Sequence, residues 1–224
     1  GCGIGAALTG LRPVVELQFS DFAGVAFDQI LNQAAKLRFM MGGAPNLPLV
    51  IRMVSGGGVR LGAQHSQRLE ALYAHIPGLV VAMPSNPFDA KGLLAAAIQD
   101  DNPVIFLEQK LLFFDEPAPV PEERYAIALG KARIARAGTD VTVVALGALV
   151  WHAAGLACAA GVPAFIPLES TLLPPPPAAM TDLPSAPPLP PPSPPPPPPA
   201  PPPPRARPLG ARGARRPPPG AAAP

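Results

Sequence analysis

The sequence predicts an α/β domain with a mostly parallel sheet flanked by helices, followed by a disordered proline-rich tail. Two observations in the first 173 residues favour the domain: apolar runs alternate with amphipathic stretches, and several of these runs are continuously apolar. Alternating strands and helices are typical of parallel sheets, whose strands are covered on both faces. The third observation concerns the tail, because 25 of the 37 prolines lie between residues 174 and 224.

The elements follow from the spacing of apolar residues. In residues 21–36 they recur every three or four positions, which predicts a helix that Asp21 can cap. The same spacing predicts a helix over residues 89–99. Its inward-facing side chains are Leu93, Leu94, Ala97 and Ile98. Shorter helices are expected at residues 4–10 and 66–74, and strands at 13–19, 48–53, 79–82 and 104–107.

Residues 141–168 contain no Lys, Arg, Asp or Glu, so their hydropathy alone is similar to that of a membrane span. Glycines and prolines interrupt the stretch, however, and strands of parallel sheets are also continuously apolar. We therefore expect a buried strand over 141–147, a small-residue helix over 148–161 and a second strand over 162–168. No membrane association is expected.

The two parts of the chain differ in net charge. Residues 1–173 hold 12 basic and 14 acidic side chains, whereas the tail holds five arginines and one acid, Asp182. The domain therefore has no basic surplus that would predict a nucleic-acid partner. The tail has too few large apolar side chains to offset its ordering entropy. Two origins stay open for it: a shifted reading frame in a GC-rich gene, or a genuine proline-rich linker or ligand of a polyproline-binding domain.

The cysteines and glycines of the sequence do not indicate a metal site or a dinucleotide-binding site. Cys2 and Cys158 lie in apolar surroundings and are expected to be small buried hydrophobic residues. The sequence has no CxxC or Cys/His cluster of the kind that binds a metal. The glycines of residues 1–6 are similar to part of a dinucleotide fingerprint, but close helix packing through small side chains is the preferred interpretation. Glycines 56–58 predict a turn near a cofactor or subunit boundary.

Four runs in close succession are far more specific than any short motif: AQHSQ, AHIPGL, PFDAKGLL and AAIQDDNPV. With the opening GCGIGAALTGLRPVVELQFSDF, they resemble the beta subunit of the thiamine-diphosphate-dependent 2-oxo acid dehydrogenases, the pyruvate, acetoin and branched-chain enzymes. The resemblance extends to about Gly147 and is incomplete at both ends. It implies a transketolase-like pyrimidine-binding domain over 1–147, a connection with a remnant of the C-terminal domain over 148–173, and the tail over 174–224.

The resemblance also implies a cofactor and its contacts. Thiamine diphosphate would be shared with an alpha subunit. Phe22 matches the aromatic residue that packs against the aminopyrimidine ring, and Gln18 falls beside that ring. His65 matches the active-site histidine near the thiazolium. The alternatives are a core role for Phe22, an ordinary strand position for Gln18 and a structural role for His65. The family's glutamate that binds the pyrimidine N1′ falls before Gly1, so the chain as given lacks it.

A potassium ion is a further implication, since some family members bind one at the loop written here AIQDDNP. The matching residues are Leu49, Ala97, Ile98, Asp100 and Asn102. Hard cations require several oxygen ligands from such a turn. The alternative is a helix end whose Asp and Asn simply close the turn.

Partners follow from the same resemblance. An alpha subunit would hold the diphosphate and its magnesium in a heterotetramer, and a lipoyl acyltransferase core would accept the acyl group. Three functions stay open: an active beta subunit, an inactive fragment or frameshifted product with the same fold, and an interaction protein that works through its proline-rich tail. The run AQHSQRLEA favours pyruvate or acetoin enzymes, but the 2-oxo acid cannot be identified. We expect a cytoplasmic protein in a bacterium, or a mitochondrial matrix or plastid protein in a eukaryote.

Overall fold

A computed structural model describes residues 1–115, 117–161, 164–168 and 171–172; the predicted tail lies outside the described residues. The helices are α1 (Cys2–Leu8), α2 (Leu37–Met40), α3 (Glu70–Ala74), α4 (Pro87–Gln99) and α5 (Leu149–Ala159). The strands are β1 (Val14–Leu17), β2 (Val50–Ser55), β3 (Val80–Ala82), β4 (Val104–Gln109), β5 (Arg133–Arg136), β6 (Val141–Thr142), β7 (Ala164–Leu168) and β8 (Thr171–Leu172). Short 3-10 or π segments are η1 (Ser20–Ala26), η2 (Gln29–Ala34), η3 (Ala63–His65) and η4 (Lys110–Phe114).

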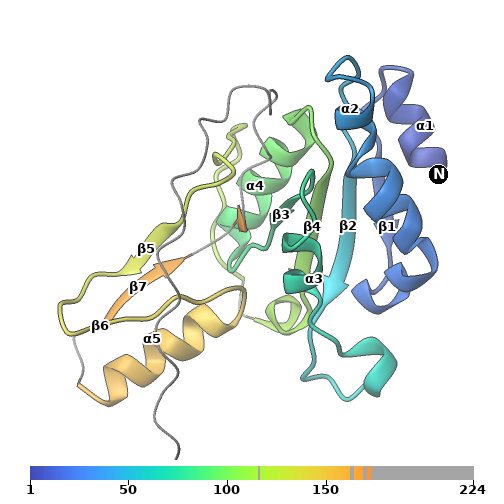
Figure 1. Ribbon diagram of the computed structural model, residues 1–224. Coiled ribbons are helices and arrows are strands. Elements are labelled where there is room, and N and C mark those ends of the chain that lie inside the picture. The colour runs from blue at the N-terminus through green and yellow to red at the C-terminus, as the bar shows by residue number, and fades with distance from the viewer. Residues whose placement is uncertain (116, 162–163, 169–170, 173–224) are drawn as a thin grey trace, which may run out of the picture. The chain divides into compact units, whose positions relative to one another are not determined.

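The main sheet has the strand order β1-β2-β4-β3-β8, and its first four strands lie side by side in Figure 1. In register, Val50 of β2 lies opposite Val14 of β1 and Val104 of β4, and Val104 also lies opposite Val80 of β3. These four strands are parallel, whereas β8 pairs with β3 in the antiparallel sense at the edge. The predicted mostly parallel sheet is therefore confirmed. Its parallel strands all end at one edge.

Helices cover both faces of this sheet. On one face, Ile51 and Ile105 pack with apolar residues of α1, η1, η2 and α3. On the other face, their neighbours Val50 and Val104 pack against Leu93 of α4. Successive strand residues point to opposite faces, so burial on both faces explains why the strands are continuously apolar.

Helix α4 packs as its sequence predicts, but it begins at Pro87 and not at residue 89. The Asn86 side chain caps its first turn, where its Oδ1 accepts a hydrogen bond of 2.8 Å from the backbone N–H of Asp89. Pro87 occupies the first turn, where a missing N–H costs nothing. Leu93 and Ala97 are buried in the core, and Leu94 and Ile98 pack against it.

The helical character predicted over residues 21–36 is confirmed, and so are its core contacts at Ile30 and Ala34, but the segment is not one regular α-helix. The chain instead forms the 3-10 segment η1, the π segment η2 and then the separate helix α2. In η2 the Ala35 N–H donates to the Ile30 carbonyl at 3.0 Å, a five-residue bond that widens the turn. Asp21 does not cap a helix, because its Oδ1 accepts from the distant Gln67 N–H at 3.0 Å. The apolar periodicity is therefore kept, while the hydrogen-bonding pattern changes along the segment.

The helix predicted over residues 66–74 is also too long, since α3 begins at Glu70. The preceding backbone is used elsewhere: the Gln67 N–H bonds to Asp21, and its carbonyl accepts from Gly56 N–H at 3.0 Å. A helical turn at Gln67 would break both bonds. The loop that carries His65 is therefore tied to the ends of β1 and β2.

The region after β4 differs most from the prediction. Strands β5, β7 and β6 form a small separate sheet packed with α5, and β5 was not predicted. Of the buried strand expected at 141–147, only Val141–Thr142 is a strand, and Val141 and Val144 are 48% and 60% exposed.

Cys2 and Cys158 are both exposed, so the prediction that they are buried is wrong. Helix α5 buries only Val150 and Ala157, which leaves Cys158 uncovered. The boundary at residue 147 stays a prediction.

No helix within the described residues combines the length and apolar character needed to cross a membrane.

The turn between α3 and β3 requires glycine. Gly78 has φ +102°, and a Cβ there would lie 2.0 Å from the carbonyl oxygen of Ala35. We expect Gly78→Ala to lower the free energy of unfolding by about 1–3 kcal/mol from left-handed backbone strain alone. The clash with the Ala35 carbonyl adds to this loss. Urea denaturation measures the change.

Gly155→Ala is the matched control, because the added methyl meets nothing within 4 Å inside α5. It should raise stability by about 0.5–1 kcal/mol. Equal effects of the two substitutions would contradict the described turn.

Candidate functional site

Polar and aromatic residues gather where the parallel strands end. Phe19 and Ser20 follow β1, Ser55 ends β2, and Lys110 follows β4. In open parallel sheets, ligands bind at the edge formed by the carboxyl ends of the strands. The sheet therefore places these side chains at the edge where chemistry is expected.

Three rings form one cluster at this edge. The ring centroids of Phe19 and Phe22 lie 5.4 Å apart, and those of Phe22 and His65 lie 5.2 Å apart. The Phe19 and His65 rings, 4.9 Å apart, complete the triangle, and all three pairs meet edge to face. We call Phe19, Phe22 and His65 the ring cluster. Two residues predicted from distant parts of the sequence, Phe22 and His65, are thus brought together.

The ring cluster is partly open to solvent. Phe22 is 41% exposed, and Gln18, directly before the cluster, is also exposed. The expectation that Phe22 is a core residue therefore does not fit, since a core ring would be covered. No contact within the described residues joins the Gln18 side chain to the cluster, so its role stays a prediction.

A set of buried polar atoms includes residues of this region. Within the described part of the chain, five such atoms have no protein partner: Ser20 Oγ, Asp21 Oδ2, Ser55 Oγ, His65 Nδ1 and Glu70 Oε2. Buried polar atoms are normally paired, so a group of unpaired ones is an unusual feature that points to a ligand or solvent site. Three of the five residues flank the ring cluster directly in sequence or belong to it.

Two charged residues, Lys110 and Asp21, lie next to the ring cluster or to the loop that carries His65. Neither was predicted from the sequence as a site residue. Lys110 is only 4% exposed; its Nζ lies 4.9 Å from the Phe19 ring centroid and donates to the His65 carbonyl. The Asp21 Oδ1, which accepts a hydrogen bond from the Gln67 N–H, holds the loop on the C-terminal side of His65. A charged residue directly after a buried strand was the signal that could have identified Lys110.

The predicted potassium residues lie at the opposite, amino-terminal edge. There the Arg12 Nη1 donates to the carbonyl oxygens of Ile98 and Asp100, each at 3.0 Å. The Leu49 carbonyl accepts from Val104 N–H at 2.8 Å. With these oxygens engaged by protein donors, the residues as arranged do not fit a potassium ion. Ala97, also predicted, is buried in the core.

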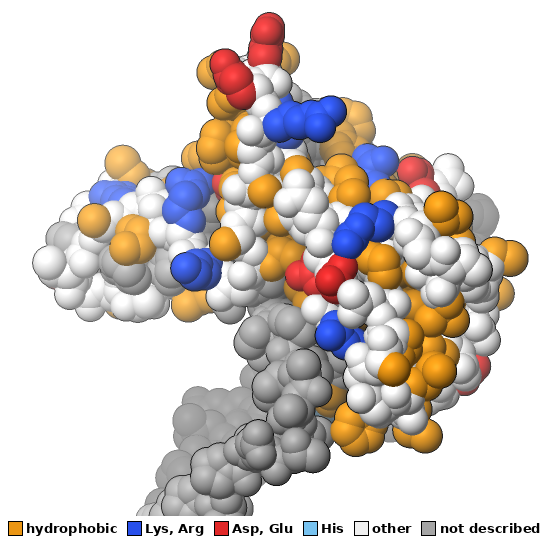
Figure 2. Space-filling model, turned by 90° about the horizontal axis from the view of Figure 1, so that it is seen from above, with side chains coloured by type: hydrophobic (Ala, Val, Ile, Leu, Met, Phe, Trp, Pro, Cys, Tyr) orange, Lys and Arg blue, Asp and Glu red, His pale blue; other side chains and the backbone are white. Residues whose placement is uncertain are grey.

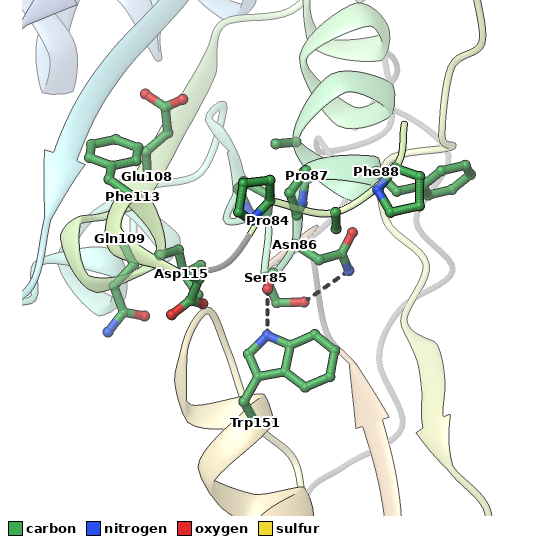
Figure 3. A pocket seen from close by; sticks show the side chains of 15 residues that line it. Pro84, Ser85, Asn86, Pro87, Phe88, Glu108, Gln109, Phe113, Asp115 and Trp151 are labelled. Atoms are coloured by element: carbon green, nitrogen blue, oxygen red, sulfur yellow. Dashed lines mark hydrogen bonds between the residues drawn. The ribbon is translucent and has the colours of Figure 1, made fainter. Parts of the chain in front are cut away.

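A cavity of about 410 Å³ lies elsewhere on the carboxyl edge, beside β3, β4 and α5. Its apolar walls include Phe88, Phe113 and Trp151, and the Trp151 Nε1 donates to the Ser85 carbonyl at 2.7 Å (Figure 3). The cavity includes neither Phe22 nor His65. We place the functional site at the ring cluster, because unpaired polar atoms lie there.

The ring cluster is chemically suited to an aromatic heterocycle. The exposed Phe22 provides an apolar surface for stacking, and unpaired hydroxyl and carboxylate oxygens lie nearby for polar edges. The described residues contain no group of three or more His, Cys, Asp or Glu that could hold a metal ion. These residues fit one side of thiamine diphosphate, while the open surface leaves the other side to be covered.

Comparison with known proteins identifies the family. Residues 1–114 match the model of the transketolase pyrimidine-binding domain. The beta subunit of acetoin:2,6-dichlorophenolindophenol oxidoreductase from Cupriavidus necator is 55% identical over 68% of this chain and 45% of its own length. The beta subunit of the pyruvate dehydrogenase E1 component from Rhizobium meliloti is 52% identical over 66% of this chain and 32% of its own length. The chain thus spans less than half the length of these relatives.

A solved structure supports the fold. A split-gene transketolase, described as an inactive β4 tetramer, has a TM-score of 0.61 with 23% identity, covering 76% of this chain and 53% of its own. At that identity the likeness shows the fold alone.

The pKa of the buried residue Tyr73 provides a test by pH. Burial, and secondarily the Asp21 carboxylate, raise the pKa of Tyr73 from 10.0 to about 12. The unfolded state therefore loses this proton first, so wild-type stability should fall between pH 10 and 12. Tyr73→Phe removes that loss. Urea denaturation at about pH 9 and pH 11 should show the variant gaining on the wild type at the higher pH. A constant stability difference would contradict the burial of this hydroxyl beside Asp21.

Proposed function

Because the chain belongs to the family of transketolase pyrimidine-binding domains, we propose that it supplies the aminopyrimidine side of a thiamine diphosphate site. The enzyme would be a 2-oxo acid dehydrogenase that decarboxylates its substrate and passes the acyl group to lipoamide. The observation that carries this proposal is the ring cluster at the carboxyl edge, which joins Phe22 to His65, whose Nδ1 is buried without a protein partner.

Phe22 and Gln18 would bind and orient the cofactor. The exposed ring of Phe22 offers an apolar contact for the pyrimidine, and Gln18 offers an amide that can bond to the ring's polar edge. Phe19 supports Phe22 edge to face and is itself contacted by Lys110. When bound, thiamine diphosphate supplies a nucleophilic carbon that accepts the electrons released on decarboxylation.

His65 is the proposed acid–base residue. Its ring is fixed by Phe19 and Phe22, and its backbone carbonyl by Lys110. Its Nδ1 is buried without a protein partner, so a proton on this ring can be exchanged with a bound group instead of being used structurally. We propose that His65 stabilises negative charge on the reacting substrate and assists acyl transfer.

A second subunit would complete the site. The ring cluster lies on an open surface, and the sequence has no GDG-type motif for a diphosphate and magnesium. We therefore propose that an alpha subunit holds the diphosphate and Mg²⁺ in a heterotetramer. The relatives' names support this, since each is designated a beta subunit. A lipoyl acyltransferase core is the proposed acceptor of the acyl group.

The test uses the chain joined to the N- and C-terminal segments of a relative and co-expressed with that relative's alpha subunit. We expect thiamine-diphosphate-dependent decarboxylation of a 2-oxo acid such as pyruvate, measured by reduction of a dye. His65→Ala should lower the rate roughly 10²–10⁴-fold, the usual contribution of a positioned acid–base group.

His75→Ala is the matched control, because His75 is exposed and lies outside the ring cluster. It should leave the rate unchanged. Full activity of a folded His65→Ala enzyme would show that His65 only packs. Absence of any activity in the unsubstituted assembly would favour the inactive-fragment alternative.

A further inference from the structure

At the amino-terminal edge of the sheet, charged side chains bond to one another and to backbone carbonyls. Arg12 lies just before β1, and the turn between α4 and β4 lies just before β4, so parallel pairing brings the two together. Besides its bonds to Ile98 and Asp100, Arg12 donates from Nη2 to Asp101 Oδ1 at 2.6 Å. Figure 2, which looks onto this edge, shows basic and acidic side chains side by side.

Several other oxygens of this turn also have donors. Asp100 Oδ1 accepts from the backbone N–H and the side-chain amide of Asn102, each at 2.8 Å. The Asn102 Oδ1 accepts from Arg38 Nη1 at 2.8 Å. Asp101 Oδ2 accepts from the Asn46 amide at 3.1 Å. The Arg12 guanidinium thus pairs with the Asp101 carboxylate, and the Arg38 guanidinium bonds to the Asn102 amide oxygen. Two positive charges accompany the two carboxylates of the turn, so the turn carries no excess negative charge to attract another cation.

The position suits a guanidinium. The last carbonyls of a helix lack partners within the helix, and the negative end of the helix dipole favours a cation there. The planar fork of arginine can bond to a carbonyl pair and a carboxylate at once, which a spherical ion cannot do with the same directionality.

We propose that the Arg12 guanidinium is the built-in cation of the α4–β4 turn and occupies the oxygens that a monovalent metal ion would otherwise use. The folded chain then needs no potassium for stability at this turn. Removing the Arg12 side chain uncovers a site for a small cation, for which methylguanidinium is the closest replacement.

The full chain tests this directly by thermal unfolding in potassium, sodium or tetramethylammonium chloride at equal ionic strength. We expect the same Tm in all three salts. A saturable rise in Tm that potassium alone produces would overturn the proposal, since it would show an ion bound beside Arg12.

Arg12→Ala should lower the Tm by several degrees, and millimolar methylguanidinium should restore part of the loss in this variant but not raise the wild-type Tm. Arg124→Ala, which removes an exposed arginine remote in sequence from this turn, is the matched control and should change little. Equal losses in the two variants, or equal effects of methylguanidinium on variant and wild type, would overturn the proposal.

Asp101→Asn provides a milder substitution in case Arg12→Ala does not fold. It weakens one contact of Arg12 and keeps the two carbonyl bonds. Its Tm should therefore fall less than that of Arg12→Ala and stay independent of the cation. A potassium-specific rise in this variant would count against the proposal.

Discussion

The parallel pairing of β1, β2, β4 and β3 is the constraint on which the rest of the molecule depends. In this register Val14, Val50, Val104 and Val80 lie in one row, so the four strands start together and run in the same direction. Residues that follow the strands meet at one edge, although they lie as far apart in the sequence as Phe19 and Lys110. Burial of both faces fixes the register, because a one-residue slip would exchange the residues of the two faces.

This constraint separates two kinds of polar chemistry. At the amino edge the polar groups satisfy one another: Arg12 and Arg38 bond to the oxygens of the α4–β4 turn. At the carboxyl edge, Ser20, Ser55 and His65 retain buried polar atoms without protein partners. A closed network stabilises a turn, whereas unpaired buried groups cost free energy unless a ligand or solvent pairs with them. The contrast between the edges is the reason for assigning binding to the ring cluster.

Much of the fold could be predicted from the sequence because burial imposes periodicity. The apolar strands and the amphipathic helix α4, with Leu93 buried, follow from that periodicity and are confirmed. In the segment 21–36 the 3-10 and π geometry was not predicted, nor was the distant Gln67, which takes the Asp21 side chain away from a cap. Phe22 and His65 were identified by resemblance and are brought together, whereas Lys110 required knowledge of the sheet. The potassium prediction did not anticipate Arg12, whose contacts span 86 and 88 residues of sequence.

Binding of thiamine diphosphate to the assembly with an alpha subunit tests the central claim most directly. Calorimetric titration should show that Phe22→Ala weakens cofactor binding by about 10-fold or more, because it removes the exposed ring of the cluster. Phe39→Ala removes another exposed ring, 66% accessible and on α2, and should leave the affinity unchanged. Equal affinity of both variants and the wild type would contradict the assignment of the cofactor to the ring cluster.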